Sequence, residues 1–264
     1  MTNSILLVIL GIGVMLLMVT GILLAVISNQ RKKNQHRTAM EKLREQQQNQ
    51  LIEAAVRSEE MERHRIAETL HDEVGAILSS AKLHLLGIKA NLLDARDQSL
   101  HEKGRELLNE VIQKVRGISH NLHSNILKEF GLNEAIRHFI KKVTQGTIIS
   151  ASTTLDDSYT TQSPDDDISM YRIVQELINN ILKYAHATEI LISSELLGDR
   201  LHLVIFHNGK GLSQDRFESL RYQKDGLGLK NIQNRIILLK GNISFTGGEE
   251  GYRINIDVPV HKTH

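Results

Sequence analysis

The sequence predicts an α+β protein, with helices in its N-terminal half and a C-terminal domain built on a mixed sheet. Three observations support this prediction. The chain has 264 residues but only two prolines, Pro164 and Pro259, so long helices can run through most of it. Apolar residues recur at helical spacing up to about residue 128. Beyond about residue 130, short segments rich in β-branched residues are interleaved with helical ones.

The composition excludes several classes of protein. With 41% hydrophobic and 24% charged residues, a globally disordered chain is excluded. The absence of cysteine excludes disulfides, cysteine-ligated zinc, iron–sulfur clusters and a thiol redox switch. The formal net charge is +1, so no global basic field favours nucleic acid, and we expect no direct nucleic-acid partner.

The first predicted element is a membrane anchor at residues 1–28. Residues 5–27 carry no charge, and Thr20 is their one polar side chain. As a helix this run measures roughly 34 Å, enough for a bilayer core of about 30 Å. A cleaved signal peptide is the alternative, but it would have a basic start and an apolar run of only about 7–15 residues. Arg31, Lys32, Lys33 and Arg37 follow, so the positive-inside rule places the N-terminus outside and the rest in the cytoplasm.

The second predicted element is a helical linker at residues 29–61. Residues 29–66 lack Gly and Pro and are rich in Gln, Glu, Lys and Arg. One interpretation is a solvated spacer helix. The other is a coiled coil, which we favour because a single helix cannot bury so narrow an apolar stripe by itself. The stripe consists of Met40, Leu43, Leu51, Ala54, Ala55 and Met61.

The sequence pattern predicts a helical hairpin that dimerises at residues 62–128. Each helix has one apolar stripe at helical period, and residues 91–103 are expected to connect them. One hairpin is thin, so two copies would form a dimeric four-helix bundle, which predicts a homodimer. The stripes are Leu70, Val74, Ile77, Ala81, Leu85 and Ile88, then Val111, Val115, Ile118, Leu122 and Ile126.

His71 lies beside the first stripe, at the expected rim of the bundle. A rim histidine is ordinarily a surface residue. The carboxylate of Asp72, directly after it, can accept a hydrogen bond from one ring nitrogen. That bond fixes the tautomer in which the other nitrogen is a nucleophile.

Residues 129–264 predict a compact domain with a mixed sheet covered by helices on one face. Helices are expected at 129–144, 168–187 and 228–239. Strands are expected at 147–153, 188–194, 201–207, 242–245 and 252–258, with a turn near Gly198 and Asp199 and a polar loop at 154–166. Asp165, Asp166 and Asp167 are placed favourably at the positive N-terminus of the second helix.

Three polar clusters fall in this domain. One face of the 168–187 helix carries Glu176, Asn180 and Lys183. This face is either exposed to solvent or a site for a metal–phosphate group. Residues 207–211 follow a strand and form either a hairpin turn or a glycine turn that a flat ligand can approach. Residues 225–231 open a helix, where backbone N–H groups bind phosphate, but their spacing fits neither a Walker A loop nor a Rossmann fingerprint.

The order of these signals resembles a bacterial two-component sensor histidine kinase over residues 60–260. The likeness is strongest to the nitrate-sensing and DesK-type class, whose phosphoacceptor box Glu-Arg-x-Arg-Ile-Ala-x-x-Leu-His-Asp matches residues 62–72. The resemblance implies that residues 175–183 are the N box and that 208–211 and 226–229 are two glycine boxes. It also implies a C-terminal ATP-binding sandwich of the type found in gyrase and a class of heat-shock ATPases, here termed the GHKL type.

The resemblance further implies the chemistry. His71 would accept the γ-phosphoryl group of ATP, with Asp72 as base or orienting acid, and pass it to an aspartate in the receiver domain of a separate response regulator. The enzyme would be anchored in the bacterial inner membrane. ATP and Mg²⁺ would be bound by Glu176, Asn179, Asn180, Lys183, His207, Asn208, Gly209, Gly211, Gly226, Gly228 and Leu229, with Asn180 as the metal ligand.

Two positions depart from the family pattern. His207 stands where the first glycine box usually begins with Asp, whose carboxylate accepts the adenine amino proton. A neutral imidazole can accept that bond and an imidazolium cannot. Ala76 stands where related kinases often carry a Gln that serves phosphatase activity. The alternatives are a catalytically weak nucleotide-binding scaffold, which His207 motivates, and a serine kinase or ATPase, against which the His-Asp box argues.

Overall fold

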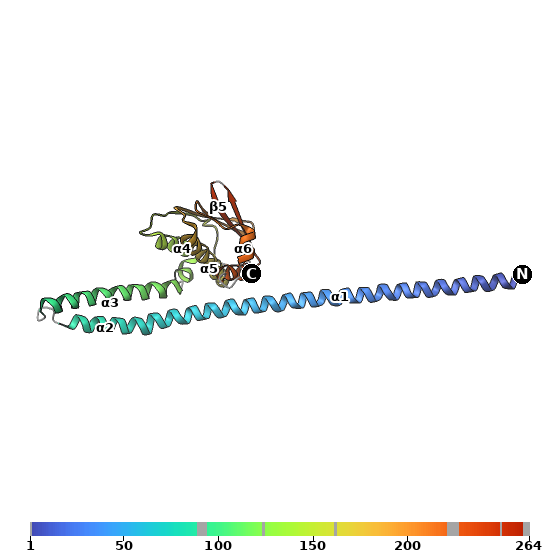
Figure 1. The fold of residues 1–264 in the computed structure, drawn as a ribbon, viewed down its shortest axis with the longest axis horizontal. Coiled ribbons are helices and arrows are strands. Elements are labelled where there is room, and N and C mark those ends of the chain that lie inside the picture. The colour runs from blue at the N-terminus through green and yellow to red at the C-terminus, as the bar shows by residue number, and fades with distance from the viewer. Residues whose placement is uncertain are drawn as a thin grey trace. The chain divides into compact units, whose positions relative to one another are not determined.

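The structure is a computed structural model that describes residues 2–88, 94–122, 125–160, 163–220, 227–248 and 250–260. The chain divides into two compact units, Met1–Leu51 and Ile52–His264. Figure 1 shows the helices of the N-terminal half and the α/β domain that follows them. The α+β class is confirmed.

One continuous helix, α1 (Thr2–Thr69), forms the start of the chain. The predicted helix at residues 29–66 is thereby confirmed. Residues 28–51 are exposed along their whole length, including the apolar stripe at Met40, Leu43 and Leu51. Within the described part of the chain, no helix is long and apolar enough to cross a bilayer. Most side chains of the predicted anchor at residues 1–28 lie outside the described part of the chain.

A helical hairpin follows, made of the π-helical segment η1 (Leu70–Val74), α2 (Gly75–Gly87) and α3 (Ala95–Leu122). The prediction of a connection over residues 91–103 was wrong, because α3 already begins at Ala95. Asp94 caps this helix: its Oδ1 accepts the backbone N–H groups of Arg96 and Asp97 at 3.0 and 2.8 Å. Residues 89–93 of the predicted connection lie outside the described residues.

The hairpin packs through few side chains. Within the described part of residues 52–122, only Ala67, Ile112 and Ser119 are buried, and the Ser119 hydroxyl donates to the Ala67 carbonyl at 2.9 Å. Two residues of the predicted stripes lie off these helices, because Ile88 follows α2 in extended backbone and Ile126 belongs to α4. Of the others, Ile77 is 69% exposed and Ile118 is 51% exposed. One chain therefore does not bury them.

The C-terminal domain contains a five-stranded sheet of order β1-β2-β3-β5-β4. The pair β1–β2 is parallel and the other three pairs are antiparallel, which confirms the predicted mixed sheet. Gly198 and Asp199 join β2 to β3, as predicted. The strands are β1 (Ser150–Thr154), β2 (Glu189–Leu197), β3 (Arg200–His207), β4 (Asn242–Gly248) and β5 (Gly251–Pro259).

Helices cover one face of this sheet, as Figure 1 shows for α4 and α5. Buried and more exposed residues alternate along β3, because only the helix-facing side chains enter the core. The helices are α4 (Asn125–Thr144), α5 (Pro164–Asn180) with the π-helical segment η3 (Ile181–Ala185), α6 (Gln214–Leu220) and α7 (Leu227–Leu238). Helix α4 is interrupted at Gly131, whose φ of 79° favours glycine. Helix α6 was not predicted.

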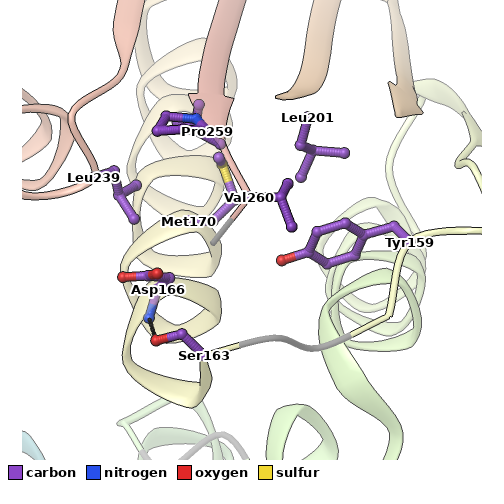
Figure 2. A pocket seen from close by; sticks show the side chains of 9 residues that line it. Tyr159, Ser163, Asp166, Met170, Leu201, Leu239, Pro259 and Val260 are labelled. Carbon is purple, nitrogen blue, oxygen red and sulfur yellow. Dashed lines mark hydrogen bonds between the residues drawn. The ribbon is translucent and has the colours of Figure 1, made fainter. Parts of the chain in front are cut away.

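Helix α5 begins four residues before its predicted start, at Pro164. The hydroxyl of Ser163 caps it by accepting the backbone N–H of Asp166 at 3.3 Å, as Figure 2 shows. The three aspartates therefore form its first turn. A cavity of about 20 Å³ beside this cap has room for about one water, so it belongs to the packing of the core.

Candidate functional site

A cavity of about 740 Å³ lies beside the C-terminal part of α5. We call it the α5 cavity. It is bordered by η3, the loop after β3, α6 and the start of α7. Eight of the predicted site residues line it: Glu176, Asn179, Asn180, Lys183, His207, Gly211, Gly228 and Leu229. Asn208 and Gly209 are not among its lining residues, and Gly226 lies outside the described residues.

The amphipathic pattern of α5 and η3 places the polar side chains at this cavity. Val174 and Ile178 are fully buried on the opposite face, so Glu176 and Asn180 point away from the core. Asn180 Nδ2 donates to Glu176 Oε1 at 3.5 Å. That bond engages the amide nitrogen and leaves the amide oxygen, the atom that Mg²⁺ prefers. The residues present therefore fit a Mg²⁺ ion shared with a phosphate group.

Lys183 supplies a positive charge at the edge of the α5 cavity. Its Nζ lies 5.0 Å from the centroid of the Tyr184 ring. A hydrogen bond with the Tyr184 side chain raises the pKa of Lys183, so the ammonium stays protonated at neutral pH. Lys210 and Arg216 also line the cavity, and neither was predicted as a site residue from the sequence. Three cations around one cavity suit a polyphosphate anion.

His207 forms part of the cavity wall and is 2% exposed. Its ring stacks on Tyr252, with centroids 5.9 Å apart and an angle of 14° between the planes. Burial lowers the pKa of His207, so the ring is neutral at pH 7. Its Nδ1 has no hydrogen-bond partner among the described residues. A neutral ring in this wall can accept or donate a hydrogen bond, depending on its tautomer.

Asn208 binds the protein's own backbone, and Gly209 lies close against it. Asn208 Oδ1 accepts the N–H groups of Thr188 and Glu189 at 2.9 and 3.0 Å, which ties the end of β3 to the start of β2. A Cβ atom on Gly209 would lie 2.3 Å from the Ala185 carbonyl oxygen. Gly209 thus lets its loop pack closely against the end of η3. This packing fixes the path of the loop that carries Gly211.

Gly228 brings the first turn of α7 against the polar edge of α5. A Cβ atom there would lie 1.9 Å from Glu176 Oε1. The backbone of this turn and the Glu176 carboxylate therefore border the same side of the cavity. Free N–H groups in the first turn of a helix bind anions.

His71 and Asp72 lie in η1, far along the chain from the cavity residues, and neither lines the α5 cavity. The predicted hydrogen bond is present: His71 Nδ1 and Asp72 Oδ1 are 2.7 Å apart. The His71 side chain is 75% exposed, as predicted for the rim. With Nδ1 held as the N–H donor, Nε2 keeps its lone pair and is accessible.

No group of three or more His, Cys, Asp or Glu side chains that could hold a metal occurs among the residues that were described and searched. At the α5 cavity, the carboxylate of Glu176 and the amide oxygen of Asn180 are available oxygen donors. Mg²⁺ commonly binds in this way, with one or two protein ligands.

Two family models match the chain. Residues 62–127 match the histidine kinase model HisKA_3, and residues 165–262 match the model for histidine kinase-, DNA gyrase B- and HSP90-like ATPases. A curated relative is the sensor histidine kinase MctS of Rhizobium johnstonii, 28% identical over 217 residues. The match covers 79% of this chain but only 45% of that relative, so the chain spans less than half of its length.

Solved structures with detectable likeness include the histidine kinase domain of the blue-light activated kinase EL346 of Erythrobacter litoralis. That match has 13% identity and a TM-score of 0.46, and covers 71% of this chain and 94% of that one. Full-length ShkA in complex with AMPPNP matches with 17% identity and a TM-score of 0.46, over 77% of this chain and 46% of that one.

Proposed function

Because the chain belongs to the sensor histidine kinases of the HisKA_3 type, enzymes that use ATP, we propose that His71 is its phosphoacceptor and the α5 cavity its ATP·Mg²⁺ site. The observation that carries this proposal is the bond between His71 Nδ1 and Asp72 Oδ1. It selects the tautomer in which an exposed Nε2 is the nucleophile.

The proposed transfer is an in-line displacement. The lone pair of His71 Nε2 forms a bond to the γ-phosphorus as the bond from that phosphorus to the β–γ bridging oxygen breaks. The bridging oxygen keeps the electron pair and leaves as part of ADP. Asp72 stabilises the positive charge that develops on the imidazole and can take the Nδ1 proton.

The cavity residues have separate proposed roles. Asn180 would supply its amide oxygen to Mg²⁺, which neutralises charge on the phosphates when it is bound. Lys183 would bind a phosphate oxygen, and the first turn of α7 at Gly228 and Leu229 would approach the phosphates through its backbone N–H groups. Catalysis would thus consist mainly of positioning and electrostatic stabilisation.

His207 would border the adenine ring, because it forms part of the cavity wall. We propose that the neutral imidazole of His207 accepts a hydrogen bond from the adenine amino group. In the family pattern, a carboxylate accepts this bond. Burial lowers the pKa of His207 and favours the neutral, accepting form.

We also propose the domain arrangement and the partners. Residues 1–28 would anchor the chain in the bacterial inner membrane, with the N-terminus outside and residues 29–61 as a coiled-coil linker. Residues 62–128 would dimerise, because the exposed stripes at Ile77 and Ile118 need a partner. The catalytic domain, 129–264, would serve a separate response regulator, whose receiver aspartate takes the phosphoryl group.

The test uses the full chain with γ-labelled ATP and Mg²⁺. We expect label on the protein that is lost in acid and stable in base, as a phosphoramidate is. Chelation of Mg²⁺ should abolish labelling, and an isolated receiver domain should remove the label from the kinase. Acid-stable label, or label that does not require Mg²⁺, would contradict the proposal.

A further inference from the structure

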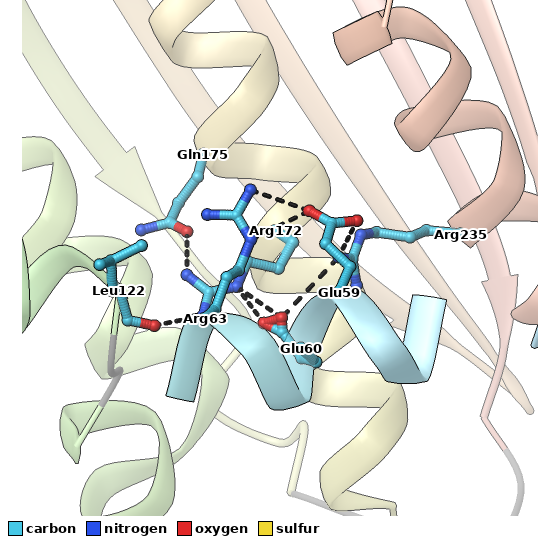
Figure 3. Close-up of polar contacts among 7 residues, drawn as sticks. All are labelled: Glu59, Glu60, Arg63, Leu122, Arg172, Gln175 and Arg235. Atoms are coloured by element: carbon cyan, nitrogen blue, oxygen red, sulfur yellow. Dashed lines mark hydrogen bonds and ion pairs between the residues drawn. The ribbon is translucent and has the colours of Figure 1, made fainter. Parts of the chain in front are cut away.

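A partly buried ion network joins α1 to the C-terminal domain, within the unit Ile52–His264. Figure 3 shows Glu59, Glu60 and Arg63 of α1 facing Arg172 of α5 and Arg235 of α7. The carboxylates stand between the guanidinium groups, so each positive group faces a negative one.

Glu60 and Arg172 form the tightest pair. Arg172 Nε donates to the two carboxylate oxygens of Glu60 at 2.5 and 3.2 Å. The side chains are 19% and 9% exposed, so both charges are largely removed from water. Arg172 also donates through Nη1 to Gln175 Oε1 at 2.8 Å and through Nη2 to the Leu122 carbonyl at 2.6 Å. One guanidinium therefore connects α1, the end of α3 and α5.

Arg235 joins α7 to the same two carboxylates. Its Nη2 lies 3.2 Å from Glu59 Oε2 and 3.8 Å from Glu60 Oε2, and its side chain is 3% exposed. Arg63 donates to Glu59 at 2.9 Å from one turn further along α1. Burial lowers the pKa of Arg235, an effect that Glu59 and Glu60 oppose. The arginine is thus held in the interior by carboxylates from another part of the chain.

The network borders the α5 cavity. A smaller cavity of about 60 Å³ lies within it, and Glu176 and Asn179 line both cavities. None of the described residues 52–122 lines the α5 cavity, and His71 is exposed. In this arrangement the catalytic domain is docked on the helix that leads to His71, while His71 of the same chain is not at the cavity.

We propose that Glu59 and Glu60 form an ionic latch that holds the catalytic domain at rest, and that a signal carried along α1 releases it. This inference rests on the proposed function, because release matters only if His71 must reach the nucleotide. A partly buried ion network suits a switch. The two carboxylates offset the cost of removing Arg172 and Arg235 from water, but loss of the carboxylates leaves two largely buried positive charges, which favours separation.

The first test removes the charges of the latch in the full chain. Glu59→Gln combined with Glu60→Gln should leave Arg172 and Arg235 without counter-charges in the docked state. We expect the initial rate of His71 labelling to rise at least fivefold, the lower end of typical coupling between sites, with ATP affinity unchanged. Glu53→Gln, an exposed glutamate earlier on α1, is the control and should leave the rate unchanged.

The second test exchanges the charges. Glu60→Arg alone should raise the labelling rate, and adding Arg172→Glu should bring it back toward that of the wild type. Rescue of this kind requires contact between the two positions. An unchanged or lower rate in the Glu59→Gln, Glu60→Gln variant, in a protein that still labels His71, would overturn the latch.

A distance measurement keeps the latch separate from the kinase activity. The chain has no cysteine, so spin labels can be attached at Ser58→Cys and Ser219→Cys, two exposed serines on α1 and α6. In labelled chains diluted with unlabelled ones, we expect one narrow distance distribution that broadens when Glu59 and Glu60 become Gln. A distribution that does not change would overturn the latch, whether or not His71 is labelled. Absence of His71 labelling in the wild type would overturn the proposed function alone.

Discussion

The two halves of Ile52–His264 differ in how completely each buries its own apolar surface. The catalytic domain has one continuous core, in which Ile178, Ile190 and Ile205 are fully buried. In the hairpin that carries His71, Ile77 and Leu107 are more than 60% exposed. The C-terminal domain therefore buries its apolar surface within one chain, whereas the hairpin does not.

This difference bears on the chemistry. The α5 cavity is formed by elements that the core fixes in place, which suits its proposed role of orienting phosphates and a metal. His71, the proposed nucleophile, lies in an exposed π-helical segment, a distortion that often marks functional positions. A rigid donor site and an accessible acceptor suit a reaction in which one part must move to the other.

The largest expected effect is that of Asp72→Asn, in the hairpin, on the rate of His71 labelling. The amide keeps the shape but removes the charge that stabilises the imidazolium, so labelling of His71 should slow by about 10²–10⁴-fold with the fold intact. The initial labelling rate measures this. Glu73→Gln, an exposed neighbour, is the control, and equal rates for Asp72→Asn and the wild type would remove Asp72 from the mechanism.

Truncation of Ile178 to Ala should destabilise the protein, whereas the same truncation in the exposed hairpin stripe should not. Ile178 is fully buried, so the truncation should lower the free energy of unfolding of the catalytic domain by about 2–5 kcal/mol. Ile77→Ala on the exposed stripe should leave that domain's transition in place. Denaturant unfolding followed by circular dichroism makes the comparison, and similar losses in both variants would show that the two regions do not differ as described.

A charge in the hairpin stripe tests whether a second chain covers it. Val74 is half-buried in one chain, and burying an unpaired carboxylate in a bundle is costly. Val74→Asp should raise the dissociation constant of the dimer at least a hundredfold, or about 2.7 kcal/mol. Light scattering across a dilution series gives the mass. A wild type that is monomeric at micromolar concentration would refute the dimer.

The smallest expected effect concerns His207 and pH. Burial lowers its pKa below the usual 6.5, so the neutral ring is stabilised in the folded protein. The stabilisation is present above pH 6.5 and is lost as the pH falls through the lowered pKa. ATP affinity should fall up to about tenfold over the same range, because protonation turns an acceptor into a donor.

Titrations of ATP binding from pH 5 to 8 test this prediction. His207→Asp should bind ATP more tightly with a flatter pH profile, and His207→Ala serves as the control. The same affinity and profile in all three proteins would exclude His207 from adenine recognition.

Much of the domain was predictable because its helices and strands follow simple periods. Helical spacing predicts the shared face of Glu176, Asn180 and Lys183 on α5, and Gly198 and Asp199 predict the β2–β3 turn. The starts of α3 and α5 were misplaced because Asp94 and Ser163 cap them through single side-chain bonds, and an Asp or Ser in a polar stretch is equally typical of a loop.

The contacts made over long sequence separations could not be predicted. Asn208 looked like part of a ligand site, yet its amide oxygen binds the backbone of Thr188 and Glu189. Glu59 and Glu60 looked like two of many charges on a solvated helix, and only the fold brings Arg172 and Arg235 to them. The sequence pattern records periodicity along the chain and not which distant charges meet.

The most direct test of the account is to locate the phosphate. Full-length protein labelled with γ-labelled ATP is digested at alkaline pH, and the modified residue is identified by mass spectrometry. The account predicts acid-labile phosphate on His71, no label in His71→Gln, and normal label in His84→Gln, an exposed histidine of the same hairpin. Phosphate on any other residue, or label that persists in His71→Gln, would contradict it.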